Sequence, residues 1–142
     1  MTMSMLGLQA QTDYTSEIVN PSFEQGMTGW IYKSLGVQGN DIFTLKAGSN
    51  YVEKWTGRGG AVGNGSLTQT LQNMNPGHYR LKVAAQNIQE DTPRAAQDGA
   101  CIFAGGHQQA VTIRQDYTLD FVQVSDKLKI GIYIINGKKA VR

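Results

Sequence analysis

The feature that most limits what this chain can fold into is an alternation of apolar and polar residues on both sides of one turn. Ser66–Met74 alternates before the turn, and His78–Ile88 alternates after it. Between them, Asn75-Pro76-Gly77 is a turn sequence, because proline presets φ and glycine accepts a positive φ. The pattern predicts a hairpin with one buried and one solvated face, packed against a second sheet.

The same period of two recurs along the chain, and no amphipathic helix interrupts it. We expect strands over the residue ranges 14–19, 30–35, 42–46, 51–55, 66–74, 78–88, 100–104, 110–113, 117–124 and 128–135. Turns or loops are expected at 36–41 and in the polar stretch 89–99. The pattern predicts an all-β protein, an antiparallel two-sheet β-sandwich of jelly-roll type.

The end of the sequence predicts an incomplete last strand. Asn136-Gly137 favours a type I′ hairpin turn, yet only Lys138–Arg142 follow it. We therefore expect the final strand to be missing or truncated, which would expose a sheet edge near the first strand.

Composition indicates one globular domain, since 40% of the 142 residues are hydrophobic and 17% are charged. The net charge is +2, and no Lys or Arg precedes Lys33, which argues against a nucleic-acid groove. No apolar run has the length of a membrane span, so we expect none. Cys101 is the single cysteine. It lies in an apolar run and is interpreted as a buried, unreactive thiol.

Residues 1–13 are set apart from the domain, which we place at 14–142. The first ten residues are uncharged and rich in Met and Leu, like the end of a secretory signal peptide cleaved after Ala10. The basic start of such a peptide is missing, however, and Leu8 is larger than the residue usual two positions before the cleavage site. A signal-peptide remnant and a disordered tail both stay open. The first predicts an exported protein in the periplasm, at the cell surface or secreted.

Asn20–Trp30, which reads N-P-S-F-E-Q-G-M-T-G-W, is expected to form a structured crossover between two strands. Asn20-Pro21 forces the backbone out of a helix, and the two glycines of this stretch permit tight bends. Phe23 and Trp30 are expected to be buried.

This stretch resembles the opening of a galactose-binding-like β-jelly-roll domain, of the kind found as carbohydrate-binding modules and accessory domains in secreted bacterial polysaccharide-processing proteins. Three later motifs follow in the order that the family shows: Glu53-Lys54-Trp55, then Leu67–Leu71 leading to Pro76–Leu81, then Leu128–Ile132. The resemblance covers roughly residues 18–141. It implies a sugar-binding function and, through Asn20 and Glu24, a structural calcium ion. The carboxylate that relatives supply from the last strand is absent here, so the calcium site would be incomplete. If no calcium binds, Glu24 is expected to accept hydrogen bonds from loop amides.

No convergent catalytic set is visible, so we do not expect an enzyme. His78 and His107 lie outside any metal-ligand spacing, and no nucleophile elbow or phosphate-binding loop occurs. The carboxylates are scattered along the sequence. Two of them could still meet in a folded glycosidase, which keeps that class open as a third hypothesis.

A sugar-binding surface needs an exposed aromatic platform with polar groups beside it. The richest stretch is Tyr51–Arg58, with Trp55 as the platform and Tyr51, Glu53 and Arg58 around it; Tyr32 is a second platform. In the competing interpretation, Trp55 belongs to the core and Glu53 with Arg58 forms a surface ion pair. Outward-facing Gln72, Arg80, Lys82 and Gln86 form either a glycan-binding sheet face or an ordinary solvated one.

Two functions follow. The first is a non-catalytic carbohydrate-binding or accessory domain of an exported bacterial protein, with a polysaccharide or oligosaccharide as partner. The second is an interaction or spacer domain that packs against an adjoining catalytic domain or another protein. Exposure and proximity of Trp55 and Tyr32 would favour the first, and burial of both would favour the second.

Overall fold

The computed structural model describes residues 1–6, 11–55, 63–86, 100–111 and 115–134. One sheet has four strands, in the order β10 (Gln115–Gln123), β7 (Gly77–Ala85), β1 (Thr2–Leu6) and β2 (Thr12–Asp13). A second sheet has five strands, in the order β3 (Ile31–Lys33), β6 (Gly65–Leu71), β11 (Leu128–Ile134), β8 (Ala100–Ala104) and β9 (His107–Ala110). A separate two-stranded sheet joins β4 (Gly36–Gln38) to β5 (Tyr51–Glu53).

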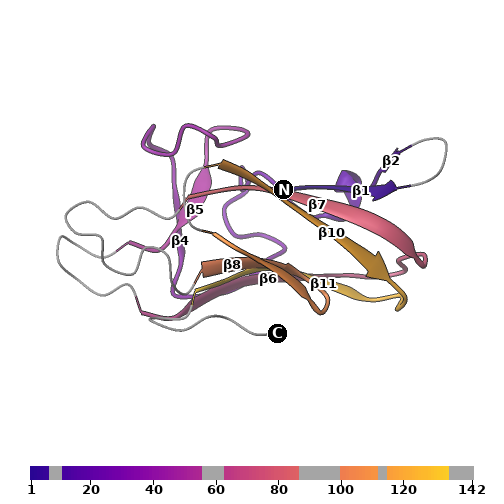
Figure 1. Cartoon of the computed structure of the whole chain (residues 1–142). Coiled ribbons are helices and arrows are strands. Elements are labelled where there is room, and N and C mark those ends of the chain that lie inside the picture. Colours follow the sequence, from indigo (N-terminus) through magenta and orange to yellow (C-terminus); the bar gives the residue numbers. More distant parts are fainter. Residues whose placement is uncertain (7–10, 56–62, 87–99, 112–114, 135–142) are drawn as a thin grey trace.

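The two larger sheets form the layers of a sandwich. Figure 1 shows β1, β7 and β10 in one layer and β6, β8 and β11 in the other, with β4 and β5 at one end and β2 toward the opposite end. The strand pairs are antiparallel. The helical element in the described residues is a single 3-10 turn, η1 (Thr15–Glu17). The predicted all-β sandwich of antiparallel sheets is confirmed.

The alternation in the sequence predicts correctly which residues enter the core. On β7, Tyr79, Leu81, Val83 and Ala85 are buried. On β10, Tyr117, Leu119 and Phe121 are buried in register with them. Apolar side chains from both sheets meet between the layers, because every second residue of each strand points inward.

The predicted hairpin around Asn75-Pro76-Gly77 is wrong: the chain bends at Asn73 and Pro76, and Gly77 begins β7 without a positive φ. β6 pairs with β3 and β11, whereas β7 pairs with β1 and β10, so the chain crosses from one sheet to the other at this point. Met74 is buried between the layers, and its N–H donates to the Asp126 carbonyl (2.9 Å). The Tyr79 hydroxyl donates to the Asn75 carbonyl (2.7 Å). These contacts hold an arch between the layers. The hairpin expected around Gly105-Gly106 does form, between β8 and β9.

The first strand was not expected. Thr2–Leu6 pairs with β7 along its whole length, and Met3 is fully buried against the core. The described part of residues 1–13 is therefore not a disordered tail. The alternation Met1, Met3, Met5 against Thr2 and Ser4 is a strand signal, but the resemblance to an export signal obscured it. That the segment is the remnant of an export signal stays a prediction.

Three local assignments also differ from expectation. Residues 14–19 hold η1 and irregular backbone instead of a strand, and 42–46 forms bends and turns. The expected turn at 36–41 begins with β4 instead. In the segment 40–50, the Asn40 side-chain oxygen accepts from the Ile42 N–H (3.0 Å), and the Lys46 ammonium pairs with Asp41 (2.8 Å). These local side-chain bonds compete with strand pairing. The Asn136-Gly137 turn, the final strand and the loop 89–99 lie outside the described residues.

The crossover at Asn20–Trp30 has the predicted aromatic anchors, but it leads from irregular backbone into β3 instead of joining two strands. Trp30 is 6% exposed, Phe23 is half-buried, and their ring centroids lie 5.4 Å apart. Asn20 has a φ of +52°, and its side-chain amide donates to the carbonyls of Gly26 (2.9 Å) and Thr28 (3.2 Å). Its backbone carbonyl accepts from the Trp30 indole N–H (3.1 Å).

Gln69, on the core face of β6, fixes the crossover to the five-stranded sheet. Its side-chain oxygen accepts from the Val19 N–H (2.7 Å), and its amide nitrogen donates to the carbonyls of Val19 and Gly29 (3.1 Å each). A buried side-chain amide thus substitutes for a missing strand partner.

Candidate functional site

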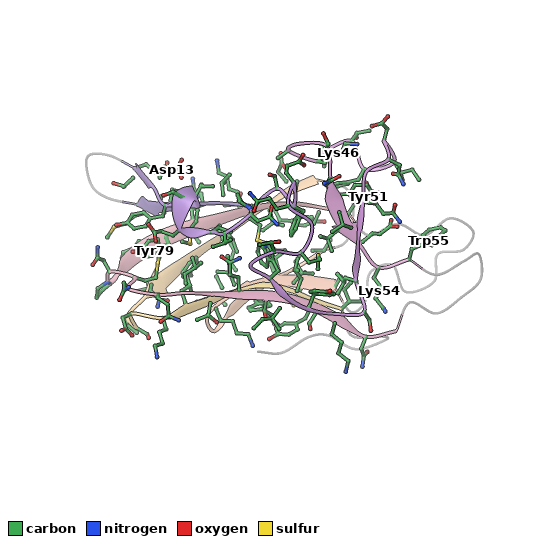
Figure 2. All side chains as sticks on the ribbon, turned by 180° about the vertical axis from the view of Figure 1, so that it is seen from behind. Asp13, Lys46, Tyr51, Lys54, Trp55 and Tyr79 are labelled. Carbon is green, nitrogen blue, oxygen red and sulfur yellow. The ribbon has the colours of Figure 1, made fainter. Side chains whose placement is uncertain are left out.

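The two-stranded sheet at one end of the sandwich holds the candidate site. β4 and β5 pair with Gly36 opposite Glu53 and Gln38 opposite Tyr51. An open depression of about 270 Å³ lies beside this pair, lined by Ser34, Leu35, Gly36, Gln38, Glu53, Lys54 and Trp55. Figure 2 shows Trp55, Lys54, Tyr51 and Lys46 at this end of the molecule, and Tyr79 and Asp13 at the other.

Trp55 is an exposed aromatic at the edge of this depression. It is 58% exposed, and Figure 2 shows its side chain projecting from the end of the sandwich. Tyr32, on the edge strand β3, is 53% exposed. It does not line the depression, although Ser34–Gly36, a few residues further along the chain, do. Both predicted platforms are therefore in solvent, and one of them faces a concave surface.

Tyr51 does not fit the predicted role. It is 7% exposed, and its ring packs 5.5 Å from the Phe43 ring. Its hydroxyl donates to the Asn40 side-chain oxygen (2.7 Å), and burial, reinforced by the nearby Glu53 carboxylate, raises the pKa of Tyr51 above its usual value. Strand alternation places Tyr51 on the same face of β5 as Glu53, but Phe43 and Asn40 of the segment 40–50 pack against it and keep it buried. The residue therefore supports β5.

Glu53 and Lys54 supply the charges of the depression. Within the described part of the chain, the polar contact of the Glu53 carboxylate is a long one, 3.5 Å from the Tyr51 hydroxyl. The Lys54 ammonium donates to the Ser34 carbonyl (3.1 Å), where Ser34 turns the chain with a φ of +58°. Among the described residues the carboxylate thus keeps acceptor capacity for a ligand, whereas the ammonium is held against the β3–β4 corner.

The remaining predicted contacts are distributed elsewhere. Arg58 lies outside the described residues. On the four-stranded sheet, Arg80 forms a bidentate pair with Asp120, its cross-strand neighbour, at 2.7 and 3.0 Å. This pair lowers the pKa of Asp120 and raises that of Arg80. Arg80 is therefore already paired on the sheet face that it shares with Lys82.

Glu24 and Asn20 do not fit a calcium site. One Glu24 oxygen accepts the backbone N–H groups of Ser49 (2.8 Å) and Asn50 (2.9 Å). The Asn20 side-chain oxygen accepts from the Gln25 N–H (3.1 Å). Calcium needs six to eight oxygen ligands, and N–H donors already point at these two oxygens. Among the residues that the structure describes, no three His, Cys, Asp or Glu side chains gather closely enough to hold a metal ion. The alternative role expected for Glu24, an acceptor for loop amides, is confirmed.

Of the lining residues, sequence reasoning finds Glu53 and Trp55 and misses the rest. It gives Lys54 no role in binding, and it places Ser34, Leu35, Gly36 and Gln38 at the end of one strand and in a turn. The signal that could have found them is the short alternation of Leu35, Val37 and Gly39 with Gly36 and Gln38. That pattern spans too few residues to be distinguished from a turn without its partner strand.

Comparisons of the chain with models of known families, with curated proteins and with solved structures found no match. In the described ranges, no helix has the length and apolar character needed to cross a membrane. The depression and its residues therefore provide the basis for a functional argument.

Proposed function

We propose that this protein is a non-catalytic carbohydrate-binding domain and that it binds its glycan at the depression beside β4 and β5. The observation that carries the proposal is the exposed Trp55 ring at the edge of a concave surface that the Glu53 carboxylate also lines. An indole face stacks on the apolar C–H face of a pyranose, and the polar groups around it accept and donate hydrogen bonds to the ring hydroxyls. The resemblance to galactose-binding-like jelly-roll domains supports the same function, and we extend it to an accessory role in an exported bacterial polysaccharide-processing protein.

Affinity electrophoresis through gels that contain plant, algal or host polysaccharides tests the proposal. The wild-type protein is expected to be retarded in at least one gel, and Trp55→Ala is expected to lose that retardation. Val124→Ala is the matched control, because Val124 is an exposed apolar residue that does not line the depression. No retardation by any polysaccharide, or an unchanged Trp55→Ala protein, would contradict the proposal.

A second function, packing against an adjoining catalytic domain, is favoured by the edge strand β3. Ile31 is 75% exposed there, beside the exposed Tyr32, and exposed apolar side chains on an edge strand are typical of contact surfaces. If this function holds, a protein that includes the neighbouring domain will melt at a lower temperature with Ile31→Asp. The same substitution would leave the melting temperature of the isolated domain nearly unchanged. Equal effects in both proteins would contradict it.

A further inference from the structure

Gly36 is a glycine that neither the backbone nor the packing of the described chain requires. Glycine in a strand usually marks a positive φ, a bulge or a close approach of another group. Gly36 is not among the positive-φ glycines, and a Cβ added to it would meet no heavy atom within 4 Å. Gly65, at the same corner, differs: its added Cβ would lie 3.1 Å from Leu35, Lys33 and Lys54 atoms. Packing therefore explains Gly65 and leaves Gly36 unexplained.

The space over Gly36 is part of the depression. Gly36 lines it and lies directly opposite Glu53 in the β4–β5 register. Side chains at directly opposed positions stand on the same face of a sheet, about 5 Å apart. A side chain at position 36 would therefore stand beside Glu53 and occupy part of the depression.

We propose that Gly36 is the floor of a subsite for one neutral pyranose ring and that Glu53 selects against acidic sugars; the inference rests on the proposed function. The ring lies against the Gly36 backbone with its apolar face on Trp55. The Glu53 carboxylate accepts from two adjacent ring hydroxyls, and Gln38 lies on the same face of the sheet pair as Glu53. The volume of about 270 Å³ suits one ring, since pockets for larger ligands begin near about 300 Å³.

The charge of the subsite supports the choice of a neutral sugar. Glu53 presents a carboxylate with only the long Tyr51 contact in the described chain, whereas the Lys54 ammonium is bound to the Ser34 carbonyl. A uronate or sulfate group would meet the carboxylate at short range in the depression, where like charges repel. Hydroxyl groups gain charge-assisted hydrogen bonds at the same place.

Titrations with short oligosaccharides of glucose, mannose and galactose, and with oligosaccharides of galacturonate and mannuronate, test the inference. Binding is followed by the protection of Trp55 fluorescence from acrylamide, and Trp55→Phe identifies the signal. The wild-type protein is expected to bind at least one neutral series about tenfold or more tighter than either uronate series. Gly36→Val is expected to weaken that binding by about tenfold or more. Glu53→Gln is expected to weaken it as well and to reduce the discrimination against uronates.

The control is Gly106→Val, because Gly106 also has no neighbour within 4 Å of an added Cβ, has no positive φ and does not line the depression. It should bind like the wild type. If Gly36→Val does not fold, Gly36→Ala is tested instead and is expected to weaken binding of the neutral sugar by a smaller factor. Uronates bound as tightly as neutral sugars, or full affinity in the folded Gly36 variant, would overturn the inference while leaving carbohydrate binding intact. A wild-type protein that binds neither neutral sugars nor uronates would contradict both the inference and the proposed carbohydrate binding.

Discussion

The crossover and the β4–β5 end of the molecule use the same residue types in opposite ways. Trp30, in the crossover, is 6% exposed, and its indole N–H is bonded to the Asn20 carbonyl, whereas Trp55 is 58% exposed. Glu24 binds two backbone N–H groups with one oxygen, whereas Glu53 has the single long contact with Tyr51 in the described chain. Each crossover group has a partner inside the protein. At the other end, the equivalent groups face the depression.

This difference separates residues that maintain the fold from residues that are available for binding. A polar or aromatic group that is satisfied internally has no interaction to offer a ligand without losing one. Membership of a motif does not show whether a residue binds a ligand. Glu24 and Trp30 belong to the motif with the family resemblance, yet both maintain the fold. The substitutions below test the division, from the largest expected effect to the smallest.

Removal of residues 1–10 should have the largest effect, because it deletes β1 from the interior of the four-stranded sheet. Met3 would leave the core, and the β7 edge would lose its partner from Thr2 to Leu6. The amino group of Met1 also donates to the Pro21 carbonyl (2.9 Å), which links β1 to the crossover. Since a domain is stable by only about 5–15 kcal/mol, we expect the shortened protein to be unfolded by circular dichroism. A cooperative thermal transition at the wild-type temperature would contradict this and would support cleavage after Ala10.

The two tryptophans give the sharpest paired test. Trp30→Ala should lower the free energy of unfolding by about 3–5 kcal/mol, because it leaves a cavity beside Phe23 and removes an internal hydrogen bond. Trp55→Ala should change it by no more than about 0.5 kcal/mol, as for other exposed positions. Urea denaturation measures both values. Similar losses for the two substitutions would show that Trp55 is part of the core and would remove the platform from the proposed site.

Glu24→Ala should cost about 1–2 kcal/mol, because the N–H groups of Ser49 and Asn50 lose their shared acceptor. An added Cβ at Gly48 would lie 2.5 Å from that Glu24 oxygen, so the contact between crossover and loop is close. We expect the loss to be the same with calcium and with a chelator. Glu17→Ala, another exposed carboxylate, is the control and should have little effect. A chelator that lowers the melting temperature of the wild type, but not of Glu24→Ala, would restore the calcium interpretation.

The sequence predicts the layers of this fold better than their connections. The alternation on β7 and β10 is long enough to specify which face is buried, and Phe23 and Trp30 lie where the crossover motif places them. The partner of each strand depends on contacts distant in sequence. Asn75-Pro76-Gly77 allows either a hairpin or an arch, and the burial of Met74 between the sheets decides for the arch. Similarly, residues 42–46 alternate like a strand, but the bonds of Asn40 and Lys46 hold them in a loop.

The site was predictable in part for a related reason. Trp55 and Glu53 could be proposed from residue type, since sugars need an aromatic face and hydrogen-bonding groups. The burial of Tyr51 could not be predicted, because it depends on Phe43 and Asn40 in the loop that packs over it. Gly36 has no side chain to attract attention, and its importance is visible only when β5 is placed beside it.

Asp120 provides the smallest expected effect and combines both sides of the comparison, because it is exposed like Trp55 yet paired like Glu24. The hydrogen bonds from Arg80 lower the pKa of Asp120, so the charged carboxylate is favoured in the folded state. Stability from the pair is therefore fully present above the ordinary Asp pKa of about 4 and is lost as the pH falls through the lower folded pKa.

The Asp120 side chain is 52% exposed, so water screens the ion pair, and the pair stabilises the fold by at most about 1 kcal/mol. Urea denaturation should show Asp120→Asn less stable than the wild type by up to this amount near neutral pH, with the difference vanishing as the pH falls through the lowered pKa of Asp120. Asp116→Asn is the control on the same strand and face. A larger loss that persists in acid would mean that Asp120 packs into the sheet as Glu24 binds its loop, and that exposure alone does not mark a residue as free for binding.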